Sequence, residues 1–125
     1  MTRIDENKNI LCSRGDSIRF SMSCKISGSD DYYEFPAGSK FIFTIARNLR
    51  EKYLIQKVVT LNSDSETIWF ELTGEETKSL CNETAKPQEY LYDIIYNGTK
   101  SLVCYSNTEQ PKFIIYPRTY EQEGE

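Results

Sequence analysis

Hydrophobic and polar residues alternate without interruption along residues 17–27, directly after the tripeptide RGD at residues 14–16. Side chains of a β-strand point alternately to the two faces of a sheet, so this pattern predicts a strand with one buried face. A helix would instead place apolar residues about 3.6 positions apart. The apolar positions of the segment are Ile18, Phe20, Met22, Cys24 and Ile26.

Short strand-like segments separated by turn residues continue along the rest of the chain. Asn97-Gly98 lies between two of them and is a strong hairpin signal, because both residues tolerate a positive φ. Seven or eight such strands predict an all-β fold, an immunoglobulin-like antiparallel β-sandwich. The other expected strands cover residues 9–13, 40–46, 53–61, 67–72, 89–96, 101–107 and 112–117.

One segment carries a helix signal. Residues 73–76 (TGEE) match the capping box, in which the first and last residues each satisfy a backbone donor of the other. A helix over residues 74–80 is therefore expected, and it must end before Pro87.

Length and charge limit the possible architectures and partners. The chain has 125 residues, which suits a single domain over residues 1–118 with an acidic, disordered tail at residues 119–125. Its net charge is −4 and it has no long basic run, so nucleic-acid binding is not expected. No segment approaches the roughly 20 apolar residues of a membrane span, and no signal segment is visible, so no membrane partner is expected.

The side chains that most enzymes need are scarce. The chain has no histidine, and its four cysteines, at positions 12, 24, 81 and 104, form no C-x-x-C motif. A zinc site would need thiolates from four separate segments, so small buried hydrophobic cysteines are the better interpretation. We expect no metal, no cofactor and no enzymatic activity.

The sequence Arg14-Gly15-Asp16 admits two interpretations. It is the tripeptide that integrins recognise, but it also lies immediately before the alternating strand. In the second interpretation Gly15 supplies a backbone conformation that other residues resist, and Asp16 bonds the backbone of the following strand. We favour the structural turn.

The last three expected strands are apolar on both faces, whereas a strand of a two-layer sandwich needs only one apolar face. A second apolar face predicts an interface, either with another protein or with a second copy of the chain. The sequence does not tell which face is the inner one. The candidate interface residues are Tyr92, Tyr105, Ile114 and Tyr116.

The order of these motifs resembles that of a known family. An Arg-Gly-Asp strand start, the segment FELTGEET at residues 70–77 and the segment YLYDI at residues 90–94 follow one another, and FII at residues 113–115 closes the series. Together they resemble the N-terminal β-sandwich domain of phage baseplate upper proteins and related tail and head-fibre proteins. The resemblance covers about residues 9–118. It implies a structural adaptor that joins other virion proteins, with residues 14–16 starting a strand.

The expected function is therefore a phage or prophage virion structural protein, an attachment module of the tail baseplate or fibre. It would be synthesised in the cytoplasm of the bacterial host. Its contact would bury an apolar aromatic sheet face, with strand addition at an open edge as a further possibility. Alternatives are a capsid decoration or head-fibre protein, a small inhibitor of a host protein, or an adhesin-like sandwich that binds cell-surface glycans through Tyr32 and Tyr33.

Overall fold

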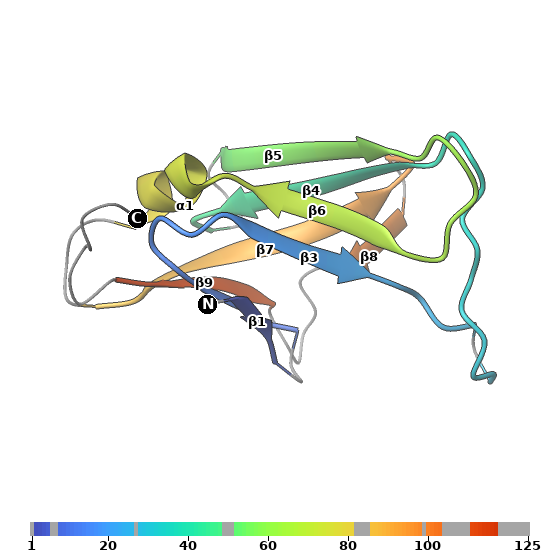
Figure 1. The fold of residues 1–125 in the computed structure, drawn as a ribbon, viewed down its shortest axis with the longest axis horizontal. Coiled ribbons are helices and arrows are strands. Elements are labelled where there is room, and N and C mark those ends of the chain that lie inside the picture. The colour runs from blue at the N-terminus through green and yellow to red at the C-terminus, as the bar shows by residue number, and fades with distance from the viewer. Residues whose placement is uncertain are drawn as a thin grey trace.

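The protein is built mostly of β-strands (Figure 1). The computed structural model describes residues 2–5, 8–26, 28–48, 52–81, 86–98, 100–103 and 111–117, and the tail predicted at residues 119–125 lies outside these ranges. Within them the elements are β1 (Thr2–Ile4), β2 (Ile10–Ser13), β3 (Ile18–Met22), β4 (Lys40–Ala46), β5 (Tyr53–Thr60), β6 (Ile68–Leu72), α1 (Gly74–Leu80), β7 (Gln88–Tyr96), β8 (Lys100–Val103) and β9 (Lys112–Tyr116).

The strands form a larger and a smaller sheet. Six strands of the larger sheet follow the order β1-β2-β9-β7-β4-β5, β8 pairs with the remaining part of β7, and β3 pairs with β6 in the smaller sheet. The prediction of purely antiparallel pairing is wrong at β2 and β9, which run parallel. These strands come from opposite ends of the chain, so no hairpin turn fixes their relative direction. No closed barrel forms among the described strands.

The turn after β7 agrees with the strand prediction, whereas the number of strands differs from it. The turn residues Asn97 and Gly98 have φ angles of 50° and 75°, as expected, and follow β7. Asn97 also holds β4, since its Oδ1 accepts a hydrogen bond from the Lys40 N–H at 2.9 Å. The first strand, β1, was not predicted, because its short segment shows no alternation; the structure therefore describes nine strands rather than seven or eight.

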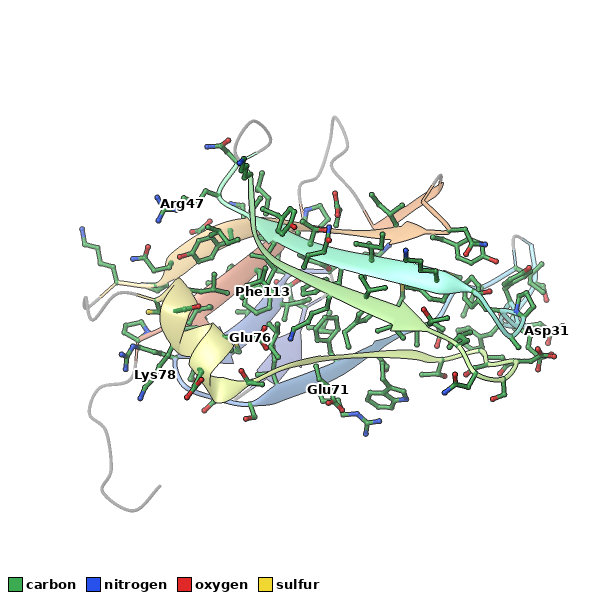
Figure 2. All side chains as sticks on the ribbon, turned by 90° about the horizontal axis from the view of Figure 1, so that it is seen from above. Asp31, Arg47, Glu71, Glu76, Lys78 and Phe113 are labelled. Atoms are coloured by element: carbon green, nitrogen blue, oxygen red, sulfur yellow. The ribbon has the colours of Figure 1, made fainter. Side chains whose placement is uncertain are left out.

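The smaller sheet packs face to face on the larger one (Figure 1). Aromatic rings of the core join the two layers. Phe43 of β4 is fully buried, and its ring centroid lies 5.2 Å from that of Phe20 and 5.6 Å from that of Phe70, both in the smaller sheet. Within its own sheet Phe43 contacts Tyr92 at 5.6 Å and Phe113 at 6.4 Å. Figure 2 shows Phe113 in the interior between the layers.

The helix begins where the capping box predicted it. The Thr73 Oγ1 accepts a hydrogen bond from the Glu76 N–H at 3.2 Å, and the Glu76 carboxylate accepts one from the Thr73 N–H at 2.9 Å. The second carboxylate oxygen of Glu76 lies 2.7 Å from the Lys57 Nζ of β5. The helix therefore closes one end of the space between the sheets, where its residue Leu80 enters the core.

The Arg-Gly-Asp turn is anchored to this helix. Gly15 has a φ of 86°, as its predicted role requires, and its N–H donates to the Thr77 Oγ1 at 3.0 Å. Thr77 is fully buried, and its hydroxyl lies 2.9 Å from the carbonyl oxygen of Asp16, to which it can donate a hydrogen bond. The Arg14 Nε donates to the carbonyl oxygen of Cys81, after the helix, at 3.2 Å. The tripeptide therefore fixes the crossing from β2 to β3.

The close approach of this turn to the helix makes Gly74→Ala a sharp test. A Cβ on Gly74 would lie 2.5 Å from the carbonyl oxygen of Gly15. Alanine is ordinarily better than glycine in a helix by about 1 kcal/mol. Here we expect the free energy of unfolding, measured by urea denaturation, to fall by about 1–3 kcal/mol because the two backbones must separate. The exposed neighbour Glu75→Ala is the control, with a change of about 0.5 kcal/mol or less. A gain in stability for Gly74→Ala would contradict the contact.

Candidate interaction surface

The structure decides which face of β7 and β9 is the inner one. Tyr90, Tyr92 and Ile94 point into the core, together with Phe113 and Ile115. Tyr92 is only 5% exposed, its hydroxyl donates to the carbonyl oxygen of Lys8, and burial raises its pKa to about 12. The prediction that Tyr92 belongs to an exposed interface is therefore wrong. Tyr92 is a core residue whose hydrogen bond connects the turn at Lys8 to β7.

The other predicted interface residues have different positions. Ile114 and Tyr116 are half-buried and lie on the opposite side of β9 from the core residues Phe113 and Ile115. Tyr105 lies outside the described residues. The predicted set therefore does not form one patch, but part of it lies on the face of the larger sheet that points away from β3 and β6. We call this face the outer face.

Strand register arranges the centre of the outer face in rows. A polar row crosses β7, β4 and β5, where Asp93 pairs with Thr44 and Thr44 pairs with Gln56. An apolar row runs beside it, formed by Ile95, Ile42 and Val58. On the other side of the polar row, Leu91 of β7 pairs with Ala46 of β4. The outer face thus places a line of polar groups between apolar side chains.

Asp93 is the unusual member of the polar row. Its Oδ1 is buried and has no hydrogen-bond partner in the described part of the chain, and desolvation by burial raises the pKa of its carboxyl. By contrast, Glu71 lies 3.1 Å from the Arg19 Nε, and Glu89 lies 2.9 Å from the Lys112 Nζ. An unpaired carboxylate oxygen away from water is costly, so this position needs an explanation beyond folding.

The outer side of the smaller sheet is different in character. Its exposed Trp69 is covered by Arg19, whose guanidinium carbon lies 4.1 Å from the ring centroid, and Arg19 also pairs with Glu71. Figure 2 shows Glu71 on the outside of this layer. These cross-strand contacts satisfy the polar groups within the chain itself. The smaller sheet therefore has the ordinary alternation of one buried and one solvated face.

The remaining candidates have contacts within the chain. Tyr32 and Tyr33 are each 44% exposed, but the Lys25 Nζ lies 5.8 Å from the ring centroid of Tyr32, and Tyr33 packs edge-on against Phe35 at 4.8 Å. Glycan binding by these tyrosines stays a prediction. No group of three or more metal-ligating residues occurs within the described ranges. No described helix is long and apolar enough to cross a membrane.

The cysteines follow the simple interpretation where the structure describes them. Cys12 and Cys81 are buried thiols, as predicted, and Cys24 is half-buried. Burial raises the pKa of the Cys12 thiol to about 12. Cys104 lies outside the described residues.

We compared the chain with protein-family models, with curated proteins and with solved structures, and none of them matches. The geometry of the outer face therefore carries the functional argument.

Sequence reasoning named Asp93 only as part of a motif. A signal was nevertheless present, because Asp93 is the one charged residue in the apolar run from Leu91 to Ile95. A carboxylate inside an apolar run of a strand is usually either paired or functional. Only the register with β4 shows that its cross-strand neighbour is Thr44 and not a cation.

Removing the charge of Asp93 should stabilise the protein. We expect Asp93→Asn to raise the free energy of unfolding at neutral pH by about 1 kcal/mol, because the buried carboxylate is replaced by a neutral amide. The pKa of Asp93 is higher in the folded protein, so its ionisation destabilises the fold as the pH rises through that value. The advantage of the variant should therefore shrink as the pH falls from the raised pKa toward about 4, the ordinary value of the carboxyl, and should be absent below it.

Urea denaturation at several pH values measures this difference. The control is Glu71→Gln, whose side chain is 69% exposed in a surface ion pair and whose loss should change stability by about 0.5 kcal/mol or less. A destabilised Asp93→Asn variant at neutral pH would show that the carboxylate has a partner within the chain.

Proposed function

We propose that the chain is a non-enzymatic binding module that holds another protein against the outer face of its larger sheet. The observation that carries this proposal is the Asp93 Oδ1, which is buried and has no hydrogen-bond partner in the described chain, at a position that strand register places on the outer face. A partner that donates to this oxygen removes a cost that the isolated chain bears. The apolar residues on both sides of the polar row supply the area that is buried in such a contact.

The chemistry of the polar row defines the partner. In its ionised form Asp93 accepts hydrogen bonds only and carries a negative charge, so the matching group is an arginine or lysine. Thr44 and Gln56 continue the row away from Asp93 and can donate to or accept from the partner's polar groups. Strands lie about 4.8 Å apart, so the three residues span roughly 10 Å. The partner surface is therefore a basic residue surrounded by apolar side chains.

The larger assembly that we propose is a phage or prophage virion, with the chain as an immunoglobulin-like attachment module of the tail baseplate or fibre. This part rests on the resemblance of the motif order. It is supported by the structural use of two of those motifs, since the Arg-Gly-Asp turn leads into β3 and the capping box starts α1. The absence of histidine from the sequence supports a non-enzymatic role.

Virion incorporation tests this proposal. Mass spectrometry of purified virions of the phage that encodes the chain should detect the wild-type protein. We expect the Asp93→Asn variant to fold at least as stably as the wild type. Its amount in virions should be lower by about tenfold or more, because a charge-assisted hydrogen bond contributes about 1.5–3 kcal/mol to binding. The Glu71→Gln variant should be incorporated normally.

Two results would contradict the proposal. The absence of the chain from purified virions would contradict the proposal that it is a virion protein. Incorporation of the Asp93→Asn variant at the wild-type level would contradict the proposal that the partner binds the outer face.

A further inference from the structure

A second feature of the molecule, away from the outer face, has the shape of a binding site. A pocket of about 210 Å³ opens between the two sheets. Its walls are mainly apolar, and an apolar cavity of about 150 Å³ is large enough to hold a benzene molecule. The pocket therefore has room for one apolar side chain. It is lined by Ile4, Lys8, Ile10, the segment 20–24, Tyr92 and Ile94.

The lining shows that the pocket follows the edge of β3. Residues 20 to 24 all line it, although successive side chains of a strand point to opposite faces. A run of consecutive residues lines one pocket only along the edge of the strand, where the backbone itself forms the wall. Alternate N–H and C=O groups of an edge strand point away from its partner and are open to a further strand.

The smaller sheet ends at this edge. Among the described residues β3 pairs only with β6, whereas six strands lie side by side in the larger sheet. On the far side of the smaller sheet β5 lies beside β6, although the two strands do not pair (Figure 1). At the edge of β3, by contrast, the larger sheet extends beyond the smaller one with β9, β2 and β1. A further strand beside β3 would lie above them.

The exposed Lys8 is one of the residues that line the pocket. None of the ion pairs between described residues involves its ammonium group. The nearby carboxylate of Asp5 is held by Asn9, through the backbone N–H at 2.9 Å and the side-chain amide at 3.0 Å. The Tyr92 hydroxyl is bound to the Lys8 carbonyl oxygen. The unmatched group of the pocket is therefore a cation, and it calls for an anion in the ligand.

We propose that this pocket is a docking site for an extended peptide segment of a partner protein. The segment adds as a strand to the edge of β3, places one apolar side chain in the pocket and sets a carboxylate against the Lys8 ammonium. Backbone pairing supplies affinity, and the pocket and the cation supply specificity. The site is independent of Asp93 and the outer face, so either proposal can fail while the other stands.

Peptide selection tests the docking site. Immobilised protein is offered a random library of short peptides with free carboxyl termini, and enriched peptides are synthesised for titration. We expect apolar residues at alternate positions next to a carboxylate. A bound peptide should also slow the alkylation of Cys24 by iodoacetamide, because this half-buried thiol lines the pocket. Mass spectrometry of the proteolytic fragment that contains Cys24 measures the rate. Asp93→Asn should leave the affinities unchanged.

Paired variants locate the contact. Ile4 is 45% exposed in the pocket wall, so Ile4→Trp should fill the pocket and weaken binding about tenfold or more, whereas Leu54→Trp, at a 43% exposed position of β5, should not. Lys8→Glu should weaken binding similarly, and Lys40→Glu, at another exposed lysine, should not.

Several results would overturn the proposal. One is a selection that enriches no peptide, and another is a set of peptides that bind Ile4→Trp as tightly as the wild type. Unchanged Cys24 alkylation would also overturn it. Dimerisation of the free chain that Ile4→Trp abolishes would show that a second copy, rather than a partner's segment, occupies the edge.

Discussion

The contact between the two sheets through Phe43 is the interaction on which the rest of the structure depends. Its ring is fully buried and touches rings from both layers, Phe20 and Phe70 on one side and Tyr92 and Phe113 on the other. Burying such rings is the main source of stability in a small sandwich. Since the smaller sheet has only two strands, it covers only part of the inner side of the larger sheet, and it leaves the outer face and the edge of β3 to other contacts.

These two surfaces differ in the chemistry that they offer to a partner. The outer face presents a buried carboxylate between apolar side chains, and it is suited to a basic residue on a folded surface. The edge of β3 presents backbone groups, a pocket and an ammonium group, and it is suited to an extended acidic segment. On the two proposals made above, the chain would join two different proteins, as an attachment module does. The Arg-Gly-Asp turn contributes to neither surface directly, because its backbone is bound to the helix.

Local patterns predicted the local structure well. The capping box placed the helix at its observed bounds, and alternation located β4 at residues 40–46, because both signals depend on neighbouring residues. Tyr92 could not be assigned to the core, because both alternating sets of side chains in β7 are largely apolar. The cost of burying Asp93 depends on which residue lies opposite it in β4, and that residue is Thr44. The pocket forms because β1, β3 and β7 lie close together in the fold. Such contacts join segments far apart in the chain, and no local pattern reports them.

The most direct test of the account is the ionisation of Asp93 itself. Carbon-13 NMR of the side-chain carboxyl, followed through a pH titration of the free protein, gives its pKa without reference to stability or to a partner. A carboxyl with a buried, unpaired oxygen must have a pKa above its ordinary value, and that is the result we predict. A pKa at or below the ordinary value would show that Asp93 is already paired or solvated. That result would contradict the proposal that the outer face is a binding surface.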